Sequence, residues 1–584
     1  MKKTSKILRA HRIIGGCLLA AVLSMWGCAA ETPPPPISVF FPSGNSQTIQ
    51  QAQSFTINAS VKNDSSGKGV TWSFVGPGSL KNQTTGSVEY DAPPSVESVV
   101  IATVTATSAA DPNQSAPFTV TITYPPVMLT QVSSDTFANG TGQHATEVEP
   151  DTFAFGSTIT STFQVSRING AGAMDIGFAT STDGGATWTN GLLPGITIFQ
   201  GGSSFNAASD PSVAYDAAHG QWIITSLAIQ NDSSGNPLQE QDVVSRSADG
   251  LHWGNPVAVN PVASYDKDWI ICDDSSSSPF YGHCYIQWSD GSGLMTTSTS
   301  IDGGLTWQAP LHTADNIAAT GAQPLVQSNG TVIAPILKAG VTDMLAFHSS
   351  DGGASWSATT EISPITDHAV AGNLRGGFPS AEMDALGTVY VVWQDCRFRA
   401  GCSSNDLVMS TSSDGANWTS PARVPIDPVS STVDHFLPGL AVDRTTSGGT
   451  AHLTLLFYYY PVSACGTVCD LYVGFVSSND GGQTWSAPVP LAGPMKTSWL
   501  PVTPGAVMVG DYFSTSYVNG SAFGVFAVAK ASSGSAFDQA MYTTAQPMIA
   551  PSAPRFSSKG ERPVPNAKSD HPPKNPRPPT RADY

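Results

Sequence analysis

The sequence of 584 residues is poor in charged side chains, which make up only 12% of it, whereas glycine, serine and threonine are abundant. This composition is typical of an exported all-β protein with many turns. Basic residues are especially scarce between residues 29 and 547, where 14 of them stand against 41 acidic residues. Such a surface should repel nucleic acid and anionic membranes, so neither is expected as a partner.

The sequence also lacks an apolar run long enough for a confident transmembrane helix. Its best candidate, Ile13–Gly27, has 15 residues and follows a basic start, which is typical of a signal peptide. The run ends Met25-Trp26-Gly27-Cys28 and resembles a bacterial lipobox. Residues 1–28 are therefore interpreted as a lipoprotein-type signal peptide with lipidation at Cys28. We expect a cell-envelope lipoprotein that meets the membrane only through its lipid anchor, with secretion after ordinary cleavage as the alternative.

Cysteine is absent between residues 37 and 125, which excludes an inter-sheet disulfide there. Six of the eight cysteines lie instead in three close pairs further along the chain. No histidine stands beside them at zinc-ligand spacing, so local disulfides in an oxidising compartment are the favoured interpretation. The predicted pairs are Cys272–Cys284, Cys396–Cys402 and Cys465–Cys469.

What the sequence does have is a repeated phrase, first seen as S-T-D-G-G-A-T-W from Ser181 to Trp188. An apolar run precedes each copy, the glycines permit positive φ, and the tryptophan can cover apolar surface beside the turn. Repetition at about the length of a four-stranded sheet predicts a β-propeller. The aspartates of the six copies are Asp183, Asp249, Asp302, Asp351, Asp414 and Asp480.

The phrase resembles the Asp-box, or BNR repeat, of sialidases and related propellers. In that family these aspartates are structural and lie opposite the active site. Seven strand-start markers accompany the six phrases over residues 126–547, which favours seven blades, with six as the alternative. The residues Met128–Val132 could supply the fourth strand of the last blade and so close the ring.

Three other regions flank the propeller. Residues 29–36 form a proline-rich linker, and residues 37–125 resemble a bacterial immunoglobulin-like β-sandwich. The resemblance is carried by Trp72 and by Tyr90-Asp91-Ala92-Pro93. Residues 548–584 are basic, rich in proline and nearly devoid of apolar side chains, so we expect a disordered tail.

The resemblance to sialidases implies three arginines that hold a carboxylate, a tyrosine nucleophile activated by a glutamate, and an aspartate as acid/base. The catalytic candidates are Tyr512 and Asp511 in the last blade. The ligand-binding candidates are Arg167, Arg375, Arg397 and Arg399. We expect Arg397 to face the channel and to form an anion clamp with Arg375.

One feature departs from the sialidase pattern. Sialidases open the first blade with Arg-Ile-Pro, and here the same place reads Val148-Glu149-Pro150. Glu149 and Asp210 or Asp511 could instead act as paired carboxylates on a neutral glycan. The same residues could bind a structural Ca²⁺ or cap the starts of strands. His144 and His435 have no recognisable nucleophile beside them, and no cofactor is required.

Two functions therefore stay open. The first is an extracellular exo-glycosidase of the sialidase (exo-α-sialidase) type that acts at the upper mouth of the propeller. The second is a non-catalytic propeller that binds a carbohydrate or a protein. The expected partner is an extracellular glycan or glycoconjugate, or a surface protein, and a monomer is expected.

Overall fold

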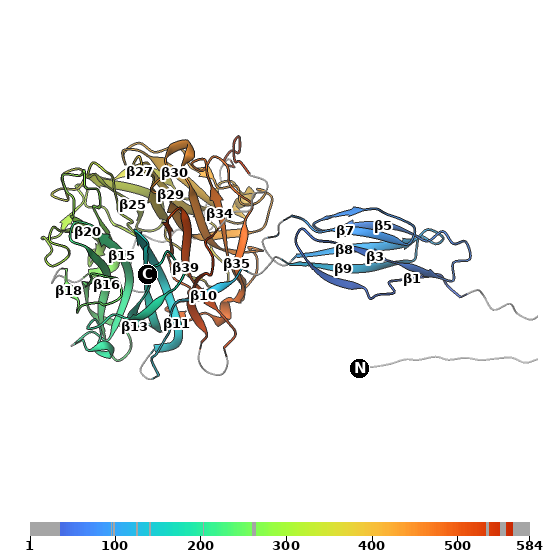
Figure 1. Ribbon diagram of the computed structural model, residues 1–584, viewed down its shortest axis with the longest axis horizontal. Coiled ribbons are helices and arrows are strands. Elements are labelled where there is room, and N and C mark those ends of the chain that lie inside the picture. The colour runs from blue at the N-terminus through green and yellow to red at the C-terminus, as the bar shows by residue number, and fades with distance from the viewer. Residues whose placement is uncertain are drawn as a thin grey trace, which may run out of the picture.

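We describe the protein from a computed structural model that covers residues 35–94, 96, 100–123, 127–138, 142–202, 204–259, 264–532, 537–548 and 556–564. The described residues form two lobes built almost entirely of strands (Figure 1). The all-β fold class is therefore confirmed. No helix among them is long and apolar enough to cross a membrane. The predicted signal peptide with Cys28 and most of the proline-rich linker lie outside the described residues.

The N-terminal lobe is a β-sandwich. One sheet has the order β2-β9-β8-β5, the second has the order β3-β7-β6, and β1 pairs with β4. Side chains of β8 and β9 are alternately buried, as expected for a sheet with one face in the core. Tyr90 is fully buried there, whereas Trp72 is only partly buried. The strands are β1 (Ser38–Phe40), β2 (Ser46–Gln50), β3 (Ser54–Asn58), β4 (Ser60–Lys62), β5 (Val70–Val75), β6 (Ser79–Lys81), β7 (Ser87–Asp91), β8 (Val100–Ser108) and β9 (Ser115–Thr123).

The second lobe is a succession of antiparallel four-stranded units, each of which follows the chain order. The first three units are β11 (Gly142–Phe155), β12 (Thr158–Ile168), β13 (Ala173–Ser181) and β14 (Thr189–Leu192); β15 (Ala207–Asp216), β16 (Gln221–Asn231), β17 (Pro237–Ser247) and β18 (Val257–Ala258); and β19 (Ser264–Cys272), β20 (Cys284–Asp290), β21 (Met295–Ser300) and β22 (Leu311–His312).

The next three units continue the pattern, and the fourth unit has an interrupted first strand. They are β23 (Ala319–Thr320), β24 (Leu325–Val326), β25 (Val332–Lys338), β26 (Asp343–Ser349) and β27 (Thr360–Pro364); β28 (Ser380–Met383), β29 (Val389–Asp395), β30 (Asp406–Ser412) and β31 (Ala422–Arg423); and β32 (Asp434–Val442), β33 (Leu453–Tyr460), β34 (Asp470–Ser478) and β35 (Val489–Lys496). Short elements between units are η1 (Ile198–Gln200), η2 (Ala400–Cys402), η3 (Gly448–Thr450), η4 (Thr497–Trp499), β36 (Val502–Thr503) and β37 (Ala506–Val507).

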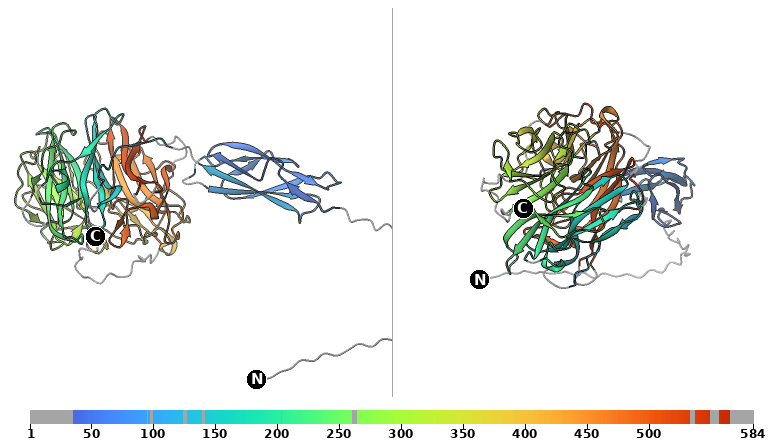
Figure 2. Two further views of the ribbon diagram at one scale, coloured as in Figure 1. Left: turned by 90° about the horizontal axis from the view of Figure 1, so that it is seen from below. Right: turned by 60° about the vertical axis from the view of Figure 1, so that its left-hand side comes forward.

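The last unit joins the two ends of the propeller. Its strands β38 (Ser514–Val518), β39 (Ser521–Ala529) and β40 (Gln539–Thr544) take β10 (Leu129–Gln131) as the fourth member. The pairing of Leu129 with Thr544 confirms the predicted closure. The first strands β11, β15, β19, β24, β28, β32 and β38 contact one another in this order, and β38 contacts β11. Figures 1 and 2 show the early and late strands side by side, so the ring is closed.

The six repeated phrases form turns of one design. At the first, Asp183 Oδ1 accepts the Ser181 hydroxyl at 2.8 Å and the Thr187 N–H at 2.9 Å. Corresponding bonds recur at the other five aspartates. These bonds lower the pKa of Asp183 to about 2, the bond from the Thr187 hydroxyl first among them. The aspartates thus satisfy turn N–H groups, which is a structural role.

Replacing Asp183 with Ala should lower the midpoint of thermal unfolding by a few degrees, because the turn loses its acceptor. Ligand binding should not change. Differential scanning calorimetry and a binding assay on the same sample measure both quantities. Asp183→Asn, which keeps one acceptor oxygen, should lose less, and equal losses in the two variants would contradict the role assigned to the oxygen atoms.

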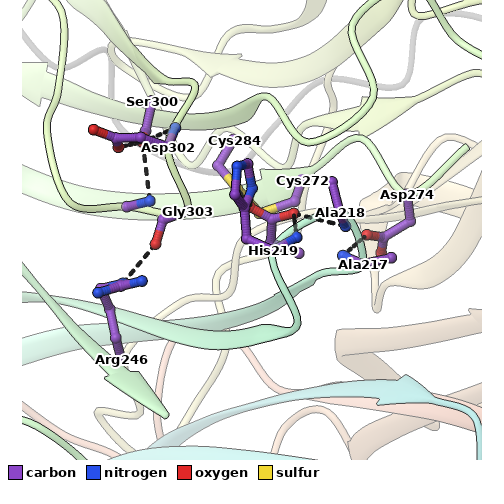
Figure 3. Close-up of a disulfide and its surroundings, with 12 residues drawn as sticks. Ala217, Ala218, His219, Arg246, Cys272, Asp274, Cys284, Ser300, Asp302 and Gly303 are labelled. Carbon is purple, nitrogen blue, oxygen red and sulfur yellow. Dashed lines mark hydrogen bonds and ion pairs between the residues drawn. A yellow bond between two sulfur atoms is a disulfide. The ribbon is translucent and has the colours of Figure 1, made fainter. Parts of the chain in front are cut away.

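All three predicted disulfides are present: Cys272–Cys284, Cys396–Cys402 and Cys465–Cys469. Cys272 ends β19 and pairs in register with Cys284, which begins β20. Figure 3 shows this bond beside His219, whose Nδ1 lies 2.7 Å from Asp216 Oδ2. The bond therefore fastens adjacent strands at the end that carries the repeated turns.

The C-terminal region differs in part from the disordered tail predicted for residues 548–584. Met548 and residues 556–564 lie against the propeller. Phe556 and Trp485 exchange backbone hydrogen bonds of 2.8 and 2.9 Å, and the Val564 N–H donates to the Arg397 carbonyl at 2.7 Å. The Phe556 residue is 42% exposed, and Glu561 Oε1 lies 3.5 Å from Arg423 Nη1. Backbone hydrogen bonds and this ion pair therefore hold the segment.

Candidate functional site

A repeated irregularity of the first strands positions the candidate site. In β11, β15 and β19 the register shifts around Glu149, Asp210 and Lys267. These residues have φ of 58°, 49° and 61°, in the left-handed region that non-glycine residues avoid. Such bulges turn side chains away from the regular alternation and are frequent beside functional sites. Leu437 in β32, with φ of 51°, shows the same irregularity with an apolar residue.

The bulges bring together a group of buried charges, called here the central charge group: Glu149, Asp210, Asp266, Lys267, Arg375 and Asp511. Asp511 is its hub. Lys267 Nζ lies 3.5 Å from Asp511 Oδ1, and Arg375 Nη2 lies 3.1 Å from Asp511 Oδ2. The Lys267 and Asp511 side chains are 1% and 3% exposed, whereas Arg375 is 19% exposed. Arg375 is therefore the member of this ion-pair set that solvent reaches.

Burial raises the pKa of two members of the group, Glu149 and Asp266, well above the usual values. The neighbouring carboxyl groups of Asp511 and Asp210 raise the pKa of Glu149 further. Gln164 Nε2 donates to Glu149 Oε2 and also to the Ser209 hydroxyl at 3.0 Å. The site thus places Glu149, whose pKa is raised, beside Asp511, which pairs with two cations.

Tyr512 lies next to this group but is not prepared as a nucleophile. Its hydroxyl donates to the Pro211 carbonyl at 3.0 Å, and the side chain is buried. Burial, with Glu149 and Asp210 next in importance, raises the pKa of Tyr512 well above the usual value. Lys267 Nζ lies over the tyrosine ring and also 4.8 Å from the Phe378 ring centre. The aromatic rings therefore pack around the buried lysine and make cation–π contacts with it.

Arg167 also contacts the same neighbourhood, but its donors are occupied. Its guanidinium donates to the Gly172 carbonyl, to the Gly170 carbonyl at 3.4 Å and to the Thr503 hydroxyl at 3.1 Å. Burial lowers its pKa, while Glu149, Asp210 and Asp511 act in the opposite direction. Arg167 thus supports the loop around residues 170–172, and it can hold no carboxylate without giving up these bonds.

The predicted clamp of Arg397 and Arg375 is not supported. Arg397 Nη2 lies 2.6 Å from Asp395 Oδ2 and donates to the Pro364 carbonyl at 2.6 Å, whereas Arg375 pairs with Asp511. Arg399 is fully buried and pairs with Asp406 and Asp427, both at 2.6 Å. The two arginines of the disulfide loop do point to different partners, as their alternation in sequence predicts. Each is fastened to a carboxylate of its own blade or loop.

Six of the eight candidate residues therefore come together around the central charge group: Glu149, Asp210, Asp511, Tyr512, Arg167 and Arg375. Sequence reasoning missed Lys267 and Gln164. A signal for Lys267 exists, because it is one of only four lysines between residues 126 and 547 and interrupts the acidic strand start Asp266-Lys267-Asp268. Gln164 carries no comparable signal, since it is one polar residue in a regular strand.

No known protein family and no curated protein match the sequence. Solved structures do resemble it. The NanB sialidase of Streptococcus pneumoniae has 14% identity and a TM-score of 0.40, over 59% of this chain and 68% of that chain. A Hadza microbial sialidase, Hz136, has 15% identity and a TM-score of 0.37, over 79% and 76%. A protein of unknown function from Dyadobacter fermentans has 15% identity and a TM-score of 0.39, over 61% and 100%.

Proposed function

We propose that this chain is an exported propeller of sialidase-like fold that binds an extracellular glycan or glycoconjugate without hydrolysing sialosides. The observation that carries the proposal is the engagement of the residues that such hydrolysis needs. The Tyr512 hydroxyl is bound to the Pro211 carbonyl, and Arg167 is bound to the Gly172 carbonyl. Neither is available to a substrate.

The proposed ligand contacts are Arg375 and Asp266. Both are partly exposed, whereas Glu149, Lys267 and Asp511 behind them are buried. Arg375 has a planar guanidinium that suits carboxylate or sugar hydroxyl groups, and Asp511 fixes its orientation at 3.1 Å. A cation at the surface of an acidic body would attract an acidic group of a glycan. We also propose that the chain is exported and anchored through Cys28, with the sandwich as a spacer.

A panel of fluorogenic glycosides, sialosides included, and a glycan array test this proposal. We expect no hydrolysis and selective binding on the array. Arg375→Ala should abolish the binding, while Arg444→Ala should leave it intact, because Arg444 pairs with Glu382 at 3.2 Å outside the central charge group. Sialoside release by the wild-type protein that is lost in Tyr512→Phe would contradict the proposal.

The arrangement of Glu149 and Asp511 favours exo-glycosidase activity as a second candidate. A carboxyl group of raised pKa next to a cation-paired one is the division of roles that general acid and base catalysis requires. Hydrolysis of a neutral glycoside that disappears in Glu149→Gln, with Tyr512→Phe still active, would establish this alternative. The Ca²⁺ ion at Glu149, Asp210 or Asp511 stays a prediction. A cation at Asp511 would compete with Lys267 and Arg375, which already pair with this residue.

A further inference from the structure

A second cluster of buried polar side chains lies away from the central charge group, between two neighbouring units of the ring. Asp406 begins β30, Asp427 follows β31, and His435 lies in β32. One carboxylate oxygen of each aspartate and one ring nitrogen of His435 lie within 4.8 Å of one another. Three side chains from two units thus converge on one point.

The arginines around this cluster bind only one side of each carboxylate. Arg399 Nη2 lies 2.6 Å from Oδ1 of Asp406 and 2.6 Å from Oδ1 of Asp427. Arg423 adds contacts of 2.8 and 2.5 Å to the same two Oδ1 atoms. The Oδ2 atoms of Asp406 and Asp427 are buried and have no hydrogen-bond partner among the described residues.

The ring of His435 also lacks hydrogen-bond partners. It is fully buried, and neither ring nitrogen makes a hydrogen bond of good geometry with any described residue. The ring packs edge-on against Phe457, with 5.3 Å between ring centres. A buried imidazole without partners is costly, and native proteins rarely leave one so. Its position beside two carboxylate oxygens that also lack partners indicates that one absent group serves all three.

We propose that Asp406, Asp427 and His435 bind a divalent first-row metal ion such as Zn²⁺ or Mn²⁺. Two carboxylate oxygens and one imidazole nitrogen are ligands that these ions accept, with water completing the shell.

The charges around the site are compatible with a divalent cation. Asp406 and Asp427 balance the two guanidinium groups of Arg399 and Arg423. Glu561 Oε1 lies 3.5 Å from Arg423 Nη1 and adds a third carboxyl group to the cluster. The three carboxyl groups outnumber the two guanidiniums, which favours a cation over an anion at this point. The ion would fasten the unit of β28–β31 to that of β32–β35.

The test uses untagged full-length protein that is stripped with EDTA, dialysed, and mixed with Zn²⁺ or Mn²⁺. Inductively coupled plasma mass spectrometry after gel filtration should find one ion per chain, and the melting temperature should rise with metal concentration. His435→Phe keeps an aromatic ring against Phe457 and should weaken metal affinity by more than about tenfold. His452→Phe is the matched control, because His452 is half-exposed beside Asp443, and it should bind as the wild type does.

Asp427→Asn provides a second variant with a different side chain at the site. It too should lose the ion. Absence of a stoichiometric ion in the wild-type protein, with both metals tried, would overturn the proposal whatever the variants do. Retention of the ion by His435→Phe, or by Asp427→Asn if the first variant does not fold, would overturn it as well.

Discussion

The Asp151→Asn variant should lose about 4 kcal/mol less stability than the wild-type protein when the pH rises from 4 to 8. Burial raises the pKa of Asp151 from 3.8 to about 7. A pKa raised on folding means that the stabilising protonated state is fully present below pH 3.8 and is lost as the pH rises through 7. At about 1.4 kcal/mol for each pKa unit, the shift corresponds to about 4 kcal/mol.

The surroundings of Asp151 explain both the raised pKa and the choice of Asn. The carboxyl group is 3% exposed and lines a cavity of about 20 Å³ at the ring of first strands. Its Oδ2 accepts the Val213 N–H at 2.9 Å, a bond that an amide oxygen can keep. The cavity has room for no more than about one water molecule, too little to solvate a carboxylate. Asn thus preserves the contact and removes the titration.

Denaturant unfolding of both proteins at pH 4 and pH 8 measures this effect. Asp232→Asn is the control, because Asp232 lies in an exposed loop and its neighbours lower its pKa. This control should follow the wild type at both pH values. Parallel curves for Asp151→Asn and the wild type would show that Asp151 is not protonated in the folded protein.

Arg399→Met should destabilise the protein by roughly 3–5 kcal/mol, because removing one partner of a buried ion pair leaves uncompensated charge. Arg399 contacts Asp406 and Asp427 at 2.6 Å and is fully buried. Methionine retains much of the apolar volume of arginine, so the loss of stability would reflect the removal of the positive charge. Equilibrium unfolding at pH 7 measures the change in free energy.

Lys338→Met is the control for this second effect. Lys338 pairs with Asp343 at 2.9 Å, but its side chain is 44% exposed. Exposed pairs contribute about 0–1 kcal/mol, so the control should lose little stability. A loss below about 1 kcal/mol in Arg399→Met would mean that the two carboxylates are satisfied without the arginine.

The sequence was most informative where the chain makes local structure. The six aspartate turns and the three cysteine pairs depend on residues a few positions apart, and the closing strand near Leu129 follows from an unpaired apolar run. The central charge group depends instead on bulges at Glu149, Asp210 and Lys267, which shift side chains out of simple alternation. No spacing in the sequence marks a bulge, so the pairing of Lys267 with Asp511 could not be predicted.

Arg397 shows a second limit of prediction from the sequence. Its alternation with Arg399 predicted opposite directions, which the structure has, but alternation does not say which direction leads to the ring centre. The segment around Phe556 shows a third. Composition predicts that a proline-rich tail cannot form its own core, yet its backbone can form hydrogen bonds with a domain that is already folded, here at Trp485 and Arg397.

The pairing of β10 with β40 has a consequence for biosynthesis. Residues 129–131 must wait for residues 542–544 before the last sheet is complete. Until then, the growing chain exposes the free edges of an open ring, where another chain could pair. A nascent or truncated chain that ends before Gln539 should therefore be prone to aggregation, so this lobe would need protection until synthesis of almost the entire chain is finished.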